Sequence, residues 1–258
     1  MQDDDFYCFD KPAGTVTQPG EGHRDDSLMN GLFALDGVNQ TRLGSQRDWG
    51  LLHRLDRETS GIVVVARTEY GYDSIRGQFE KRAVDKVYLA LLRGRLPRAE
   101  GRCEQPLSEV RRGDMKISVA AQRGEPAITH YTTLASSGDH IVVACAIETG
   151  KLHQIRAHMA HLGAPVVGDR VYRSLLPPNT SRPTQNERAK PPALRLHAWK
   201  ISFSHPRTHG RVECFAPIPT AMASAIAPAL GLPLGAIPTQ AALGRLVAQI
   251  PGTSWWKQ

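Results

Sequence analysis

The segment HRLDRETSG at residues 53–61, followed at once by IVVVA at 62–66, decides the fold of this chain. The apolar run is too uniform for a strand with one wet face, so we expect a strand that is covered on both sides. The loop before it holds a single carboxylate, Asp56, between Arg54 and Arg57. Neighbouring cations favour the charged form of a carboxylate, so the pattern predicts an ionised Asp56 available as a nucleophile. For one residue alone, an aspartate that caps the next element is the commoner interpretation.

The composition is that of a basic globular protein. The 258 residues include 32 Lys+Arg and 25 Asp+Glu, which gives a formal net charge of +7 and a pI near 9.4. This balance suits a polyanionic partner, although charge alone fits a merely basic enzyme about as well. No apolar run approaches the roughly 18 residues of a membrane span. The acidic N-terminal stretch has no apolar core of a secretory signal, so we expect a cytoplasmic protein that does not bind membranes.

The four cysteines lie far apart, at positions 8, 103, 145 and 214, and form no CxxC pair. That spacing argues against a cysteine-rich zinc site and predicts buried thiols in a reducing compartment. His158 and His161 stand at i and i+3, with His153 nearby, but no third ligand with an oriented base accompanies them. No glycine-rich phosphate motif follows a strand. The sequence therefore predicts neither a metal nor a nucleotide cofactor.

Short β-prone runs alternate with two amphipathic helical patterns. Tyr72, Ile75 and Phe79 share one helical stripe, and a second stripe over about 155–162 ends at Gly163. The segments 18–50 and 173–193 predict loops, the first with a short helix inside it. This pattern predicts an α+β fold with a mixed, mostly antiparallel central sheet flanked by helices. We expect a catalytic domain over residues 1–220 and a C-terminal helical extension over 221–258. The β-prone runs fall at 6–9, 62–66, 86–92, 117–121, 129–134, 140–147, 199–203 and 212–215.

Two further segments could carry chemistry. Lys86 and Tyr88 should lie on one face of a strand, where the tyrosine could stack on a base or move a proton. Arg156 falls near the start of the second helix, where it could form a two-bonded pair with a carboxylate. The simpler interpretations are a tyrosine at the edge of the core and an arginine with its head in solvent.

Several motifs in a fixed order give the chain a family resemblance. DKPAG at 10–14, HRLDxxTSG at 53–61, the segment 79–94, the segment 149–172 with Gly168-Asp169, and LHA at 196–198 resemble the RluA-type pseudouridine synthases. The resemblance covers about residues 6–219 and describes a stand-alone catalytic domain without an N-terminal S4 module. It implies the same α+β fold and a cofactor-free isomerisation of uridine to pseudouridine in structured RNA.

The resemblance also implies roles for individual residues. Asp56 is the expected catalytic aspartate, Tyr88 the active-site tyrosine, Arg156 the basic partner of Asp56, and Arg54 the residue that helps displace the target base. We expect a monomer that acts on transfer RNA or large-subunit ribosomal RNA after flipping the base out of its stack. The residues expected to contact RNA are Arg54, His53, Arg57, Lys86, Lys151, His153 and Gln154.

Two other classes of function remain open. The fold could serve a catalytically silent protein that binds or folds RNA, although Asp56, Tyr88 and Arg156 are all present. A hydrolase with Asp56 and Glu58 as paired acids is the third possibility, but no separate general acid is evident.

Overall fold

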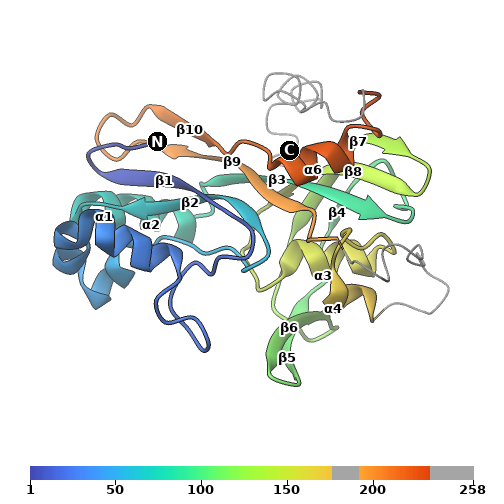
Figure 1. The fold of residues 1–258 in the computed structure, drawn as a ribbon, viewed down its shortest axis with the longest axis horizontal. Helices are drawn as coiled ribbons and strands as arrows, with labels where there is room; N and C mark the ends of the chain where they lie inside the picture. The colour runs from blue at the N-terminus through green and yellow to red at the C-terminus, as the bar shows by residue number, and fades with distance from the viewer. Residues whose placement is uncertain (176–191, 233–258) are drawn as a thin grey trace. The chain divides into compact units, whose positions relative to one another are not determined.

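The computed structural model describes residues 1–175 and 192–232. Within them most of the strand pairs are antiparallel and a few helices accompany them, so the predicted α+β class with a mostly antiparallel sheet is confirmed (Figure 1). The chain divides into two compact units, each described by itself below. Unit 1 comprises Met1–Lys86 and Ala198–Pro217, and unit 2 comprises Val87–His197 and Ile218–Gln258.

Unit 1 is built on strands in the order β1–β2–β9–β10. β1 pairs with β2, and β10 pairs with β9. The predicted hairpin near the end of the chain is thus confirmed as β9 and β10. The elements of this unit are β1 (Phe6–Lys11), α1 (Leu28–Leu43), the 3-10 segment η1 (Ser45–Gly50), β2 (Ser60–Ala66), α2 (Glu69–Glu80), most of β9 (Leu196–Ser204) and β10 (Arg211–Phe215).

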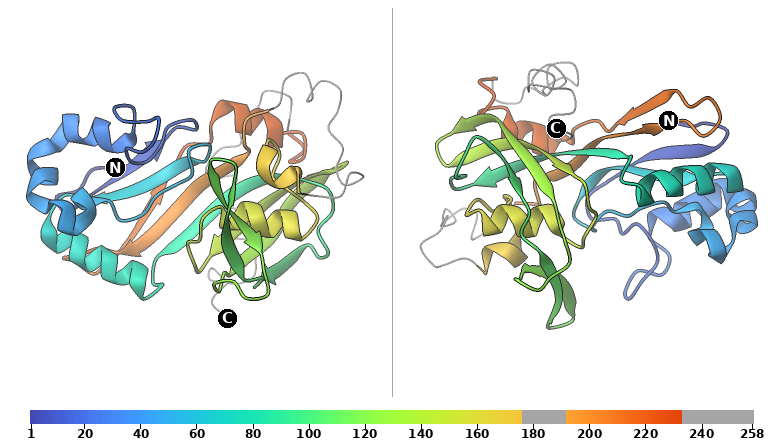
Figure 2. Two further views of the ribbon diagram at one scale, coloured as in Figure 1. Left: turned by 90° about the horizontal axis from the view of Figure 1, so that it is seen from below. Right: turned by 180° about the vertical axis from the view of Figure 1, so that it is seen from behind.

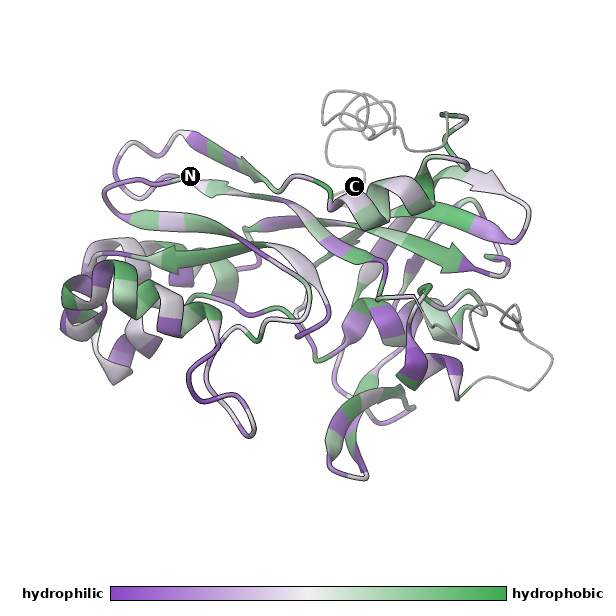
Figure 3. Ribbon diagram, in the orientation of Figure 1, coloured by the Kyte–Doolittle hydropathy of each residue, from purple (hydrophilic) through white to green (hydrophobic). Residues whose placement is uncertain are grey.

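The strand that follows the Asp56 loop lies in the core of unit 1. All seven residues of β2 are buried, which confirms the covering on both sides expected from its apolar run. Figure 3 shows β2 as a hydrophobic arrow. Tyr72 and Ile75 of α2 pack into the same apolar cluster as Val64, with Phe79 at its margin. The helical stripe read from the sequence therefore faces the sheet.

Helix α1 is longer than the short helix predicted within residues 18–50. The side chain of Ser27 accepts a hydrogen bond from the backbone of Asn30, and the Asn30 side chain accepts one from the backbone of Ser27. These reciprocal bonds satisfy amide groups that a helix start otherwise leaves without partners. Asp36 has a non-helical backbone (φ −146°, ψ 42°), so the 16-residue element is kinked there.

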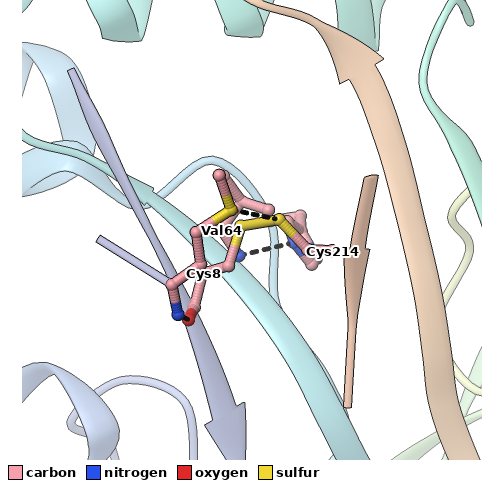
Figure 4. Close-up of a disulfide and its surroundings, with 5 residues drawn as sticks. Cys8, Val64 and Cys214 are labelled. Atoms are coloured by element: carbon pink, nitrogen blue, oxygen red, sulfur yellow. Dashed lines mark hydrogen bonds between the residues drawn. A yellow bond between two sulfur atoms is a disulfide. The ribbon is translucent and has the colours of Figure 1, made fainter. Parts of the chain in front are cut away.

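The cysteines of unit 1 correct one prediction. Cys8 of β1 and Cys214 of β10 form a disulfide beside Val64 of β2 (Figure 4). The expectation of four separate thiols was wrong for this pair, because their 206-residue separation gives no sign of their contact in the fold. Cys103 and Cys145 are free and buried, as predicted.

Unit 2 contains a second group of antiparallel strands in the order β3–β8–β7–β4. A separate two-stranded hairpin, β5–β6, projects next to helices α3 and α4 (Figures 1 and 2). The elements are β3 (Asp85–Arg93), β4 (Glu100–Cys103), β5 (Leu107–Arg112), β6 (Met115–Ala120), β7 (Thr129–Ser137), β8 (His140–Ile147), α3 (Gln154–His161), α4 (Arg170–Arg173) and α6 (Thr220–Ile226).

Two predictions concern segments that the structure describes only in part. Most of the loop expected at 173–193 lies outside the described residues, as does the chain after residue 232. At the start of the expected C-terminal extension, α6 buries Met222, Ala223 and Ile226. No helix within the described ranges is both long and apolar enough to cross a lipid bilayer.

Candidate active site

The Asp56 loop enters β2 through a tight turn in unit 1. The backbone amide of Thr59 donates to the carbonyl of Asp56 at 3.1 Å, and the Asp56 side chain is partly buried. Gly61 has φ +118°, and a Cβ there would lie 2.2 Å from the carbonyl oxygen of Ala198. Only glycine avoids both the backbone strain and the clash. The end of the loop is therefore fixed in place.

The segment 11–17 holds the loop on both sides of Asp56. The Thr17 hydroxyl donates to the carbonyl of Leu55 at 2.9 Å and accepts from the amide of Leu55 at 3.1 Å. On the other side, the amide of Gly14 donates to the carbonyl of Arg57 at 2.8 Å. The residues immediately before and after Asp56 are thus bonded to one short segment, which fixes the backbone that carries the carboxylate.

Beneath this loop lies a fully buried ammonium group that the sequence did not single out. The Nζ of Lys11 donates to the carbonyls of Pro12 at 3.0 Å, Thr15 at 2.7 Å and Arg57 at 3.2 Å. Burial lowers the pKa of Lys11 to about 8, against the opposing effect of nearby carboxylates, of which Asp56 is the strongest. Lys11 and Asp56 are therefore close enough to interact, and Lys11 supplies positive potential under the loop.

His53 supports the loop as a neutral ring. Its Nε2 accepts a hydrogen bond from the amide of Val64 at 3.0 Å, and its ring lies 5.2 Å from that of Phe79. Burial, followed by the positive charge of Lys86, lowers the pKa of His53 to about 3. The ring is therefore neutral at physiological pH, so an RNA contact of His53 would be made by an uncharged group.

Lys86 also lies near the Phe79 ring. Its Nζ is 5.8 Å from the centre of the Phe79 ring, and burial lowers its pKa to about 8, with a smaller contribution from Arg82. Arg54 and Arg57 are exposed, and the Nε of Arg57 also donates to the carbonyl of Gly14 at 3.1 Å. Three cations that the sequence assigned to RNA binding thus lie in the same unit as Asp56.

Tyr88 and Arg156 belong to unit 2. Tyr88 lies on β3 opposite Cys145 of β8 and is largely buried. Arg156, in the first turn of α3, is also buried rather than extended into solvent. Its Nε lies 2.6 Å and its Nη2 3.2 Å from the two carboxylate oxygens of Asp169.

Asp169 is a functional candidate whose role the sequence did not predict. Its side chain is fully buried, and it accepts bonds from the amides of Val171 and Tyr172, both at 3.0 Å, in addition to the pair with Arg156. A two-bonded arginine–carboxylate pair holds the guanidinium plane in one orientation. The Gly168-Asp169 motif was the available signal, but no sequence spacing identifies Arg156 as its partner.

The loop before α3 gives its three predicted RNA contacts different positions. Lys151 forms an ion pair with Glu125, and His153 has a left-handed backbone (φ 52°), with the centre of its ring 5.7 Å from the centre of the Tyr172 ring. The buried Gln154 donates to the carbonyl of Ile128 and to the Thr129 hydroxyl, and its oxygen accepts from the Thr149 hydroxyl and the Lys151 amide. These four bonds use the whole capacity of the amide, so an RNA contact of Gln154 would have to replace one of them.

The histidines of α3 do not assemble a metal site. His158 is fully buried, with one ring nitrogen 2.9 Å from the Thr129 hydroxyl and the other 2.9 Å from the carbonyl of Gln105. Both nitrogens are thus engaged with the protein. Within residues 1–175 and 192–232, no group of three His, Cys, Asp or Glu side chains is placed to hold a metal ion.

The positive charge of the chain is concentrated in unit 2. Its sequence contains 18 Lys+Arg and 9 Asp+Glu, whereas unit 1 contains 14 and 16. The sequence as a whole showed only the net value of +7. Asp56 therefore belongs to a unit that is close to neutral, and the excess of cations lies in the unit that carries Tyr88 and Arg156.

Solved structures show which class of fold this is. The chain superimposes on a structure titled Human RNA Pseudouridylate Synthase Domain Containing 1 with a TM-score of 0.61 and 25% identity, over 85% of this chain and 82% of the other. A structure titled Human RNA Pseudouridylate Synthase Domain Containing 4 gives a TM-score of 0.64 at 23% identity, over 86% and 88%. The fold is that of the pseudouridylate synthase domain.

Sequence comparison extends this from the fold to the family. Residues 5–161 match the model of the RNA pseudouridylate synthase family, and the chain belongs to that family, as the RluA-type motifs predicted. It is 36% identical over 220 residues to the ribosomal large subunit pseudouridine synthase D of Neisseria meningitidis serogroup A, covering 84% of this chain and 57% of the relative. It is 34% identical over 229 residues to the uncharacterized RNA pseudouridine synthase YlyB of Bacillus subtilis, covering 87% and 70%. The chain thus spans little more than half the length of the Neisseria relative.

Proposed function

We propose that this protein isomerises uridine to pseudouridine in structured RNA, with Asp56 as its catalytic carboxylate. The observation that supports the proposal is the set of hydrogen bonds that fixes the backbone of the Asp56 loop. Thr17 fixes Leu55, Gly14 and Lys11 fix Arg57, and the buried Lys11 ammonium lies near the carboxylate. A group that must meet one reacting atom requires this kind of preorganised backbone.

The reaction needs an anion, a proton path and no oxidant. The bond between N1 of uracil and C1′ of ribose breaks, the ring turns, and a bond forms between C5 and C1′. N1 takes up a proton, and the proton on C5 is lost to solvent. Asp56 supplies the anion that attacks the nucleotide or stabilises positive charge at C1′. The atoms of substrate and product are the same apart from proton exchange, so the balance requires no cofactor.

The remaining site residues take supporting roles in this proposal. Tyr88 packs against the uracil ring and takes part in proton transfer, and Arg156 provides the cation that stabilises the charge on Asp56. Arg54 helps displace the target base, a step that costs a few kcal/mol and is offset by backbone contacts. Arg57, Lys86, Lys151 and His153 are the proposed RNA-contacting residues.

We propose large-subunit ribosomal RNA as the first substrate to examine and transfer RNA as the second. Several relatives at 33–36% identity are named ribosomal large subunit pseudouridine synthase D. Those names describe the relatives. This chain spans only part of their length, so the target uridine has to be found by experiment. We further propose a monomer that acts in the cytoplasm.

The test is direct measurement of the product. Purified protein is incubated with ribosomal and transfer RNA labelled with tritium at C5 of uridine, and released tritium is counted while pseudouridines are mapped in cells with and without the gene. We expect Asp56→Asn to abolish tritium release yet bind RNA within about tenfold of wild type, because phosphate contacts dominate affinity. Asp25→Asn, at an exposed position outside the loop, is the matched control.

The alternative function, a silent RNA-binding protein, predicts a different outcome. Such a protein would bind RNA tightly, release no tritium from any RNA, and remain unaffected by Asp56→Asn. Release of free uracil without pseudouridine would instead support the hydrolase.

A further inference from the structure

The hairpin β5–β6 carries an unusual arrangement of charge near its turn. Arg111 lies directly opposite Lys116 in the register, so the two cations share one face of a two-stranded ribbon, and both are exposed. Like charges in that position repel each other. Glu109, on the same face, lies 3.8 Å from Lys116, and Arg111 has no ion-pair partner within the ranges that the structure describes. A paired cationic position of this kind fits a polyanion such as the RNA backbone.

The β5–β6 hairpin is joined to α4 and the residue after it by specific bonds. The Tyr172 hydroxyl donates to the carbonyl of Ser118 at 2.7 Å and accepts from the amide of Ser118 at 3.1 Å. A second connection runs from Nη1 of Arg112 to the hydroxyl of Ser174 at 3.0 Å. Both Tyr172 and Ser118 are buried, so these bonds are shielded from water. Movement of the hairpin must therefore move α4 or break these bonds.

The same short helix is joined to Arg156. Asp169 caps α4 through the amides of Val171 and Tyr172 and holds the guanidinium of Arg156 with two bonds. The guanidinium carbon of Arg156 also lies 5.3 Å from the centre of the Tyr172 ring. Tyr172 thus contacts the hairpin through its hydroxyl and Arg156 through its ring. Asp169 binds both the backbone amide of Tyr172 and the guanidinium of Arg156, which fixes the position of one relative to the other.

Apolar packing joins the hairpin, α3 and α4 into one rigid group of elements. Leu107 at the start of β5, Ala157 and Ala160 of α3, and Tyr172 of α4 belong to a single buried cluster. The hairpin, α3 and α4 are neighbours in every view of Figures 1 and 2. A displacement at one end of this group is therefore carried to the other, because close-packed interiors deform little.

We propose that Tyr172 is a positioning residue that couples the β5–β6 hairpin to Arg156, and that the ligand of the hairpin is the phosphate backbone of the RNA substrate. This inference rests on the proposed function, because it gives Arg156 a place in the reaction. RNA bound across Arg111 and Lys116 removes their mutual repulsion and draws the hairpin to one position. The bonds through Tyr172 and Asp169 then hold the guanidinium of Arg156 in the orientation used for catalysis.

Single-turnover kinetics with saturating enzyme separate binding from positioning. We expect Tyr172→Phe, which removes both bonds to Ser118 but keeps the ring under Arg156, to lower the single-turnover rate about tenfold and leave the Kd for RNA within about twofold. Arg111→Ala/Lys116→Ala should raise the Kd about tenfold and reduce the slope of log Kd against log salt by about two. Tyr70→Phe, which also removes a tyrosine hydrogen bond but lies in unit 1, should change neither quantity.

A loss of folding must be distinguished from a loss of coupling. Ser174→Ala removes two exposed hydrogen bonds, the one from Arg112 and the one that the Ser174 hydroxyl donates to the carbonyl of Val171, and we expect it to lower the rate about threefold with an unchanged melting temperature. An unchanged rate in both Tyr172→Phe and Ser174→Ala, with active wild type, would overturn the coupling. An unchanged Kd and salt slope in Arg111→Ala/Lys116→Ala would overturn the RNA contact. Wild type that forms no pseudouridine on any RNA would instead overturn the proposed function.

Discussion

The side-chain nitrogen of Lys11 lies 3.2 Å from the carbonyl oxygen of Arg57, the residue directly after Asp56. A fully buried ammonium group here has three backbone carbonyls as partners. Its hydrogen bonds hold the short stretch of backbone that carries Asp56, and its charge lies close to the Asp56 carboxylate. The stability of the loop and the environment of Asp56 thus depend on the same side chain.

Replacing Lys11 with methionine tests that dependence. Lys11→Met keeps the length of the side chain but removes its three hydrogen bonds to the carbonyls of Pro12, Thr15 and Arg57, so we expect the free energy of unfolding to fall by about 3 kcal/mol. Urea denaturation measures this loss. Lys81→Met, at an exposed position, should change stability by less than about 0.5 kcal/mol. Equal effects of the two substitutions would show that the three bonds do not hold the loop.

The partly buried ring of His53 makes stability depend on acid. Its pKa falls from 6.5 to about 3 on folding, so between these values the unfolded chain binds a proton that the folded protein does not. Stability is therefore lost as the pH falls from about 6.5 toward 3, by up to about 1.4 kcal/mol per pH unit from this group. We expect His53→Gln to flatten this part of the curve of unfolding free energy against pH. If the variant loses stability between pH 6.5 and 3 as steeply as wild type does, groups other than His53 cause the pH dependence of stability.

The contact between Gly61 and Ala198 predicts a steep cost for a single methyl group. Gly61→Ala places a Cβ 2.2 Å from a backbone oxygen at φ +118°, so we expect a loss of more than about 3 kcal/mol. Gly138 also has a positive φ, +61°, but open space around it, and Gly138→Ala should cost only about 1 kcal/mol. Thermal unfolding compares the two. A similar cost at both positions would mean that backbone conformation, rather than the contact, decides.

Gln154 should matter for folding and not for RNA affinity. Gln154→Ala removes four hydrogen bonds that join α3 to β7 and to the preceding loop, so we expect a lower melting temperature. Its Kd for RNA, measured below the melting transition, should stay within about twofold of wild type. Arg54→Ala, at an exposed position, should weaken binding without changing the melting temperature. A weaker affinity of Gln154→Ala for RNA with an unchanged melting temperature would show that Gln154 contacts RNA.

Thiol titration checks the disulfide. Without reductant, denatured protein should expose two reactive thiols, those of Cys103 and Cys145, and after reduction it should expose four. Cys8→Ser should give three thiols without reductant, because its partner Cys214 is released. Four thiols in unreduced wild type would mean that Cys8 and Cys214 are not bonded.

The sequence predicted most of what depends on local pattern. The apolar run after Gly61 predicted a covered strand, and the spacing of Tyr72 and Ile75 predicted a helix with one face toward the core. The motifs also identified the family. Pairings across long distances could not be predicted in this way. The sequence near residue 156 does not indicate that Asp169 is the partner of Arg156, and the sequence near Cys8 does not indicate that Cys214 is its partner. The four internal hydrogen bonds of the Gln154 amide could not be predicted either, because composition does not show which partners a polar side chain finds inside the protein.

The disulfide between Cys8 and Cys214 closes most of the chain into a covalent ring. The whole of the Asp56 loop, both strands of the hairpin and the Arg156 helix lie between its two ends. A protease that cuts once anywhere inside this ring leaves a single molecule, held together by the bond. Nicked protein should therefore migrate as one species in denaturing electrophoresis without reductant and as two fragments with it. The cross-link thus acts as a safeguard against dissociation after a single cut.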